Sequence, residues 1–513
     1  MPRKTTPSFV VTLPLRVCLG DERRLRDRFV CGTRLANVMI QHARTLVASM
    51  RSSEQWAAAR ALPRTTEEQR RTRAQAFGGI RKSYGFTKAD FDAVVCQHAK
   101  AAGFYGRIGT HEMQALAERV FRGADEWLCG KRGSLRFKGR NRPLHSLSGK
   151  NNKTCLSWKP DSYELQIEAG FRLQAVLPDL KRDEWLASAL MAPTKYCRLL
   201  WRNVRGQRQW SVQLIQQGLS PLKASVLERL AAEGTTGGLD IGPSTLAWCT
   251  NTDAGVFRFC AEVDRPHALI RRLQRHLDRQ RRANNPANFH PDGRCKKGAH
   301  PWTSSRRQRR TQASLTELQR HEAAVRAHAH GRDTNLLLSK ARSWKDDGVS
   351  PKALQRRYGR SISVRAPGAF MNTLTRKAER AGGGRHIIEV RALKTSQYDH
   401  TTHDCVKKPL SERWHVFRDG RGRVQRDVYS AFLALHAQGN THNPSGLDLA
   451  WGELASSLLR AGLCALKPQA VPSGTHAGPS PDVGVVRSKF LKSRSEQLTP
   501  SDAPRGLSGT LGL

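Results

Sequence analysis

Aspartates at three separate places in the chain have the residue type and the setting to hold metal ions. Asp240 ends the apolar segment TTGGLD, just before a turn at Gly242-Pro243. Asp346 and Asp347 end another short segment, and Asp427 opens an amphipathic stretch. Carboxylate oxygens are the ligands that hard cations such as Mg²⁺ prefer. If the fold brings these carboxylates together, they could hold two ions for phosphodiester hydrolysis.

Each of these aspartates also has an ordinary structural explanation. A D-x-G sequence such as that at Asp240 recurs in hairpin turns. An aspartate in the first turn of a helix, as expected for Asp427, is stabilised there by the helix dipole. The spacing of the three positions therefore does not by itself require that they meet.

The charge balance points to a polyanionic partner. The chain has 87 lysines and arginines against 43 acidic residues, a formal charge of +44 and a pI near 10.9. Such a chain repels itself unless a polyanion neutralises it, and nucleic acid is the usual one. A solvated basic surface, as in ribosomal proteins, is the alternative.

Three basic segments are candidates for nucleic-acid contacts. The first is the glycine-rich stretch 131–152, whose backbone can approach a ligand closely. The second is a predicted helix near 264–283, and the third follows Asp347. The candidate side chains are Arg136, Lys138, Arg140, Arg142, Arg271, Arg272, Arg275, Arg279, Arg356, Arg357 and Arg360.

Composition also bounds the compartment. The 11 cysteines are scattered without any CxxC pair, which fits a reducing cytosol. No apolar run approaches the roughly 18 residues that a membrane helix needs. We therefore expect a cytoplasmic protein.

The hydrophobic pattern predicts an α/β protein with a helical N-terminal part. Residues 8–18 are typical of a strand, Asp21 could cap a helix to about Met50, and residues 54–130 are helical in pattern. Alternating segments follow, including a hairpin around Arg205-Gly206-Gln207. Strand-like and helix-like pieces then alternate over 237–435, with helices near 264–283 and 311–330.

Several stretches, in order from about residue 130 to 437, resemble the TnpB family of RNA-guided nucleases, related to type V CRISPR effectors. GLDIGPSTLAW is similar to the first RuvC motif of that family. Further similar stretches are RRLQRHLDRQRRANNPANFHPDGRCKKG, LQRRYGRSISVRAPGAF, KTSQYDHTT, KKPLSERWHVF and VQRDVYSAFLA.

The resemblance implies a transposable-element-encoded, RNA-guided DNA endonuclease, with guide RNA, target DNA and two Mg²⁺ or Mn²⁺ ions as partners. A second copy of the chain is a further candidate partner. The implied fold is an RNase-H-like RuvC domain behind a helical recognition bundle and a β-barrel wedge. The implied boundaries are 1–20 for the first wedge strand, 21–130 for the bundle, 131–234 for the wedge, 235–465 for the nuclease domain and 466–513 for a disordered tail.

The family's D–E–D triad maps onto Asp240, Asp347 and Asp427 as catalytic and metal-binding residues, with Asp346 as the alternative second acid. The second acid is a glutamate in the family, so aspartate is a departure that is one methylene shorter. A site of this kind tolerates little misplacement. Two alternatives therefore stay open: an RNA-guided DNA-binding protein with weak or lost nuclease activity, and an accessory transposition protein of the kind labelled transposase.

The family commonly has a four-cysteine zinc ribbon between its second and third acids. The corresponding insert, 394–425, offers only His400, His403, Cys405 and His415, whose spacings match no strong zinc pattern. We expect no zinc and a hairpin held by packing around Tyr398, Trp414 and Phe417. Glu389 is expected to be a structural strand-edge residue and no metal ligand.

Overall fold

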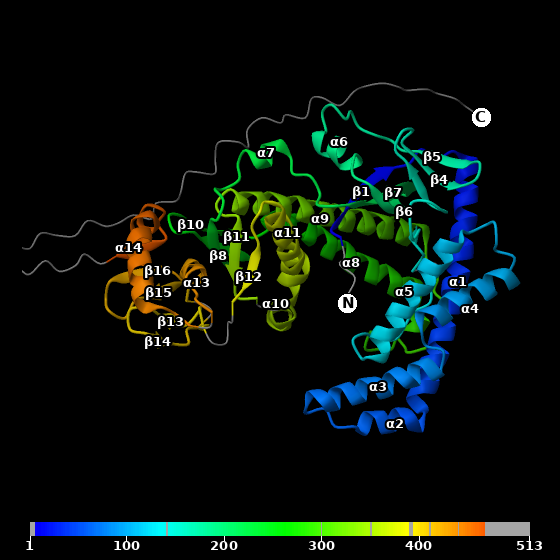
Figure 1. The fold of residues 1–513 in the computed structure, drawn as a ribbon, viewed down its shortest axis with the longest axis horizontal. Coiled ribbons are helices and arrows are strands. Elements are labelled where there is room, and N and C mark those ends of the chain that lie inside the picture. Colours follow the sequence, from blue (N-terminus) through cyan, green and yellow to red (C-terminus); the bar gives the residue numbers. More distant parts are fainter. Residues whose placement is uncertain are drawn as a thin grey trace, which may run out of the picture. The chain divides into compact units, whose positions relative to one another are not determined.

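The chain is a mixed α/β protein in the computed structural model (Figure 1). The structure describes residues 6–139, 142–298, 300–348, 351–388, 393–409, 412–439 and 441–466. Arg140, Glu389 and all but the first residue of the predicted tail 466–513 lie outside the described residues. Within the described part, no helix is long and apolar enough to cross a membrane.

The N-terminal part is helical, as the pattern predicts. A long helix, α1, spans Leu19–Ser52, and it is followed by α2 (Glu54–Ala61), α3 (Glu67–Ser83), α4 (Lys88–Ala101) and α5 (Thr110–Leu128). The expectation that Asp21 caps α1 is wrong, because Cys18 is the N-cap residue. Asp21 instead lies one turn in and accepts a hydrogen bond from the Cys18 backbone N–H at 3.2 Å, which forms a capping box.

Two antiparallel sheets accompany these helices. The first has the order β1-β7-β6-β2, and the second has the order β3-β4-β5. Their strands are β1 (Ser8–Pro14), β2 (Ser146–Ser148), β3 (Ser157–Lys159), β4 (Glu164–Glu168), β5 (Phe171–Gln174), β6 (Thr194–Val204) and β7 (Gln207–Gln217). A bridge between Leu15 and Ala175 links the two sheets. The predicted hairpin is β6–β7, and its two turn residues, Arg205 and Gly206, both have positive φ, as a primed turn requires.

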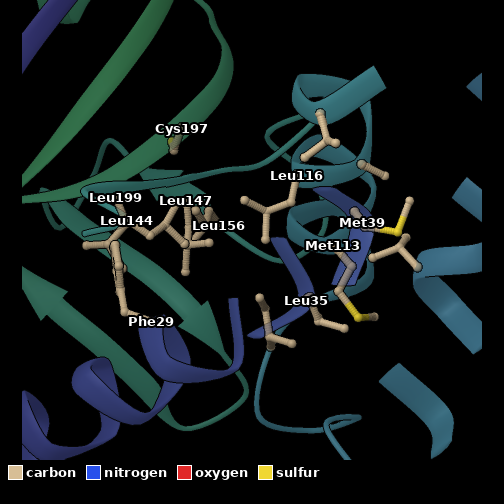
Figure 2. Close-up of a cluster of buried hydrophobic side chains, with 14 of the residues drawn as sticks. Phe29, Leu35, Met39, Met113, Leu116, Leu144, Leu147, Leu156, Cys197 and Leu199 are labelled. Carbon is tan, nitrogen blue, oxygen red and sulfur yellow. The ribbon is translucent and has the colours of Figure 1, made fainter. Parts of the chain in front are cut away.

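One hydrophobic core joins the N-terminal helices to both of these sheets. Figure 2 shows part of it, with Phe29, Leu35 and Met39 of α1 and Met113 and Leu116 of α5 among the clustered side chains. The same cluster takes in apolar residues of the sheets, such as Leu147 and Leu199. Residues from β1 to β7 therefore stabilise one another as a single packed unit.

The C-terminal part is built on a five-stranded sheet in the order β10-β9-β8-β11-β12. Its strands are β8 (Thr236–Ile241), β9 (Thr245–Cys249), β10 (Ala254–Arg258), β11 (Ser343–Asp346) and β12 (Arg385–Ile387). Strands β10, β9 and β8 are antiparallel neighbours, whereas β11 runs parallel to both β8 and β12. The parallel pairs need helical crossovers, which the intervening segments supply.

Two helix pairs make these crossovers. Helices α8 (Asp264–Asn284) and α9 (Arg306–Leu338) connect β10 to β11, and α10 (Pro351–Arg365) and α11 (Pro367–Arg380) connect β11 to β12. The helix predicted near 311–330 is longer at both ends. Ser305 caps its start by accepting a hydrogen bond from the Gln308 backbone N–H at 3.2 Å. The basic residues of the first turns are exposed, so this part of the helix has no apolar face that the sequence pattern could show.

The sheet has a separate core on each face, because side chains alternate along a strand. Ala247 and Cys249 of β9 join the core made with α13 (Arg426–Leu435) and α14 (Pro444–Arg460). Leu246 and Trp248 join the opposite core, made with α9 and α11. The remaining short strands are β13 (Tyr398–Asp399), β14 (Asp404–Cys405), β15 (Trp414–Val416), β16 (Gly422–Gln425) and β17 (Cys464–Leu466).

Candidate acidic site and basic surface

Asp240 is held where β8 meets helix α13. Gly238, two residues earlier, lies against the helix so closely that a Cβ there would come within 1.9 Å of the Ala431 backbone oxygen. Only glycine permits this approach, since any side chain would push the helix away. Asp240 itself is half-buried and pairs with Ala247 of β9. The second glycine of TTGGLD, Gly238, therefore sets how near α13 comes to Asp240.

Asp427 lies in the first turn of α13, as predicted, but it does not cap the helix. Gln425 is the N-cap residue, and its side-chain oxygen accepts a hydrogen bond from the Val428 backbone N–H at 2.7 Å. The Asp427 carboxylate instead accepts a bond from the Thr245 hydroxyl at 3.3 Å, and it lies 3.6 Å from the Arg426 guanidinium. Asp427 is only 8% exposed, and its place in the first turn is one where the helix dipole stabilises a negative charge.

The two candidates for the second acid have different surroundings. Asp346, 3% exposed, accepts hydrogen bonds from the Arg385 guanidinium of β12 at 2.5 and 2.7 Å and from the Gly348 backbone N–H at 2.9 Å. Asp347 is half-buried and close enough to Asp240 to act on its titration. Asp346 is thus engaged by an arginine, whereas Asp347 belongs electrostatically with the other two predicted acids.

The charges at Asp240 reveal this grouping. Removal from water raises the pKa of the Asp240 carboxyl well above its usual range, and the negative charges of Asp427 and Asp347 raise it further. Arg426 acts in the opposite direction but does not cancel them. Like charges that are brought together in this way disfavour ionisation. A bound cation would reverse that effect, because it favours the charged carboxylates.

The donor set fits a hard divalent ion such as Mg²⁺ or Mn²⁺, since it consists of carboxylate oxygens. Among the described residues, however, no three histidine, cysteine, aspartate or glutamate side chains are grouped closely enough to hold one ion. Asp347 and Asp427 therefore act electrostatically on Asp240, but the three side chains are not grouped closely enough to hold one ion.

A cavity of about 700 Å³ lies away from the candidate acids, and a smaller cavity lies beside Asp346 and Asp347. It has a volume of about 360 Å³ and is bordered by Asp346 and Asp347. Ile241 of β8 and Met371 and Asn372 of α11 also line it. Asp347 therefore faces open space, which leaves room for a ligand or for a longer side chain.

The predicted nucleic-acid-binding residues lie mostly at the surface. Lys138 is half-buried, and burial together with the nearby Arg119, Arg132 and Arg142 lowers its pKa. Exposed side chains are Arg136, Arg142, Arg271, Arg272, Arg275, Arg279, Arg356, Arg357 and Arg360. Within the described part of the chain, none of these arginines forms an ion pair with a carboxylate. They can therefore meet phosphates without first breaking a salt bridge.

The four candidate zinc ligands are dispersed between core and surface. His400 is buried, and its ring contacts the Tyr429 hydroxyl at 2.6 Å. Burial lowers the pKa of His400 to about 4 despite the nearby Asp448. His415 lies 3.3 Å from the Asp399 carboxylate, whereas His403 and Cys405 are exposed.

The insert packs around the expected Tyr398 and Phe417, together with Trp451, which the sequence analysis did not single out. Phe417 is buried, as expected, and contacts the rings of Tyr429 and Trp451. Tyr398 stacks on His442 with ring centres 4.0 Å apart. Trp414 is half-buried and faces Arg423. Trp451 lies on α14, outside the motifs, and only its aromatic character could have indicated a role in the core.

No protein-family model matches the chain, and no curated protein sequence matches it. Among solved structures, it is similar to a Cas12f1–sgRNA–target DNA complex determined by cryo-EM, with 10% identity and a TM-score of 0.43 over 86% of this chain and 99% of that one. It is also similar to a CRISPR-Cas12f ternary complex, with 11% identity and a TM-score of 0.28 over 81% and 82% of the two chains. Both TM-scores are too low to assign a function from these similarities.

Proposed function

We propose that this protein is an RNA-guided DNA endonuclease encoded by a transposable element, with Asp240, Asp347 and Asp427 as its catalytic acids. The observation that carries the proposal is the electrostatic grouping of these three aspartates, which come from distant parts of the sequence. A stable fold gains nothing from gathering like charges in a half-buried place. A site for a cation and a phosphodiester does require such a grouping.

The sheet supports the same proposal. Three antiparallel strands followed by two parallel ones, in the order β10-β9-β8-β11-β12, are the arrangement of an RNase-H-like domain. The three acids come from β8, from the end of β11 and from the first turn of α13. The bundle α1–α5 and the sheets β1–β7 would then be the recognition and wedge parts, which bind guide RNA and target DNA.

In this mechanism each residue has a defined task. Asp240, Asp347 and Asp427 would hold two Mg²⁺ or Mn²⁺ ions, which activate water and stabilise the leaving oxygen when bound. Thr245 fixes the Asp427 carboxylate by its hydrogen bond, and Arg385 keeps Asp346 out of the site. Because a site rich in carboxylates repels a polyanion, the exposed arginines of α8 and α10 must bring the strand in.

A second candidate is an RNA-guided DNA-binding protein whose nuclease is weak or lost. Asp347 favours it, because aspartate is one methylene shorter than glutamate and a cavity of about 360 Å³ lies in front of it. The described side chains also do not close around one point. Such a protein would find its target by base pairing and then act as a roadblock.

The test is to purify the full chain with its RNA, sequence that RNA, and offer plasmid DNA that matches it, with Mg²⁺. We expect a discrete RNA and Mg²⁺-dependent cutting that a chelator stops. Target binding without cutting would contradict the proposed nuclease activity but support the proposed guide RNA. If no discrete RNA co-purifies, the proposal that the protein uses a guide RNA is wrong.

A further inference from the structure

A pocket lined by arginines opens on the same domain as the three acids. Its volume is about 480 Å³, and it is bordered by the end of β10, the start of α8 and the C-terminal half of α10. Four arginines and one carboxylate line this Arg-lined pocket: Arg258, Arg357, Arg360, Arg365 and Asp264. The excess of positive charge makes it a site for an anion.

Two of the arginines pair with the pocket's carboxylate. Arg365 is 7% exposed, donates to Asp264 at 2.6 Å and donates to the Phe259 backbone oxygen at 2.9 Å. Arg258 also pairs with Asp264. The one carboxylate of the pocket is therefore already shared between two guanidinium groups.

The other two arginines are left to bind something else. Arg357 and Arg360 are exposed, and neither forms an ion pair within the described residues. Between them, Tyr358 has non-helical backbone angles (φ −122°, ψ 28°), which kinks α10. Kinks of this kind redirect side chains and are often found at functional sites. His267, the remaining basic group of the pocket, faces Glu322 at 3.2 Å.

The turn 242–245 links this pocket to the acidic site through hydrogen bonds. Ser361, which lines the pocket, donates its hydroxyl to the Pro243 backbone oxygen at 2.5 Å, and the N–H of Phe259, the residue after β10, donates to the Ser244 oxygen at 2.9 Å. The next residue, Thr245, donates its hydroxyl to Asp427 at 3.3 Å. Three consecutive residues thus connect α10 and the end of β10 to the third acid.

We propose that the Arg-lined pocket binds one backbone phosphate of the DNA strand that is cut, and so positions a nearby phosphodiester at the acids. Arg357 and Arg360 are the positioning residues. This inference rests on the proposed nuclease function and adds a substrate subsite to it. A strand is favoured over a free nucleotide because only the short turn 242–245 connects the pocket residue Ser361 to Asp427, so one chain of phosphates can reach both places.

The test uses the RNA-bound full chain and a set of target strands that each carry a neutral methylphosphonate at one position. We expect the penalty to be concentrated at one position, where cutting slows by about 10- to 100-fold. In the double variant Arg357→Gln/Arg360→Gln, cutting of the unmodified strand should slow similarly, and that position should lose its special penalty. A merely structural role would slow cutting without erasing the position-specific penalty.

The matched control is Arg376→Gln/Arg460→Gln, which removes the same charge from two exposed arginines that do not line the pocket and lie on neither α8 nor α10. It should keep the penalty at the same position. A penalty that survives in the Arg357/Arg360 double variant, or that disappears equally in the control, would overturn the proposal.

Binding of the same strands, measured in chelator so that nothing is cut, separates this proposal from the nuclease itself. A position-specific binding penalty that only the pocket variant loses supports the pocket even if Mg²⁺ produces no cutting. Cutting without any position-specific penalty would refute the pocket and leave the nuclease standing. Inorganic phosphate at millimolar concentration should compete weakly, whereas strong competition by it would overturn the preference for a strand.

Discussion

Two groups of buried or half-buried charges in this protein are built in opposite ways. In the N-terminal core, Arg28 lies between Glu112, at 2.5 Å, and Glu168, at 3.0 Å, and Glu112 also accepts a bond from the Gly109 N–H at 2.9 Å. Around Asp240, burial and the negative charges of Asp427 and Asp347 raise the pKa of its carboxyl, and Arg426 opposes them only in part.

The comparison distinguishes charged groups that stabilise the fold from charged groups whose arrangement suits a ligand. Removing one partner of a buried, fully hydrogen-bonded ion pair strongly lowers the free energy of unfolding, because the other charge stays buried. A group of like charges, in contrast, destabilises the chain until a cation binds, and function rather than stability explains its presence. Four predictions test this difference.

The largest effect should be on cutting. Asp347→Ala and Asp427→Ala should each lower the rate of DNA cutting by at least about 1000-fold, because each removes a carboxylate needed for metal binding, while target binding is kept. Rates on matched plasmid and affinities in chelator give the two measurements. The exposed Asp161→Ala is the control and should cut normally. An Asp347→Ala protein that still cuts would shift the second acid to Asp346.

In the N-terminal core, Glu112→Gln should lower the free energy of unfolding by about 3 kcal/mol, since it removes the buried carboxylate and leaves the Arg28 guanidinium with only the partly exposed Glu168 as a counter-charge. Denaturant unfolding of the full chain measures this. Glu118→Gln, which breaks partly exposed pairs with Lys88 and Arg122, should change stability by less than about 1 kcal/mol. Equal effects of the two substitutions would remove the distinction between the charge groups.

At the acidic site, removing a carboxylate should raise the free energy of unfolding instead of lowering it. Asp240→Asn should raise the free energy of unfolding by about 1 kcal/mol in metal-free buffer, because it removes a charge that burial and two carboxylates disfavour. The pKa of Asp240 is raised in the folded protein, so wild-type stability is lost as pH rises from the unfolded value near 3.8.

The advantage of Asp240→Asn over the wild type should therefore grow as pH increases above about 4. Asp346→Asn serves as the matched control and should destabilise the protein, since Arg385 loses its partner. Thermal unfolding of all three chains over a pH series makes the comparison. A wild type that is more stable than Asp240→Asn at neutral pH without metal would contradict the reading.

The smallest effect should come from lengthening the second acid. Asp347→Glu should raise the cutting rate severalfold, up to about tenfold, because a longer side chain can place its oxygens nearer the other acids. The cavity in front of Asp347 can accept the methylene. Asp427→Glu should lower the rate, since Asp427 is buried at the start of α13. An unchanged rate for Asp347→Glu would mean that aspartate is already well placed.

Much of the local structure could be predicted because it depends on neighbours in the sequence. Alternation and turn residues identified the β6–β7 hairpin, whose Arg205-Gly206 turn is purely local. The glycine after Asp240 and the amphipathic stretch after Asp427 placed these acids at a strand end and a helix start. The helix caps were harder, since Cys18 and Gln425 accept their bonds through side chains that are rarely caps.

The Arg-lined pocket could not have been predicted from the sequence. Arg357 and Arg360 were recognised as basic, but nothing in the order of residues indicates that Asp264 and Arg365, about 100 positions apart, form one wall. The connection through Pro243 and Ser361 depends on the packing of α10 against the turn after β8.

The sequence by itself determined the charge of the protein, the identity of Asp240 and Asp427 as candidates, and the glycine, Gly238, that lets α13 approach β8. Only the tertiary structure separated Asp346 from Asp347, which are identical in type and adjacent in sequence. The physical reason is that the two residues have different neighbours in space. Asp346 ends β11 beside the parallel strand β12 and accepts hydrogen bonds from its Arg385, whereas Asp347 follows the strand and lies near the distant Asp240.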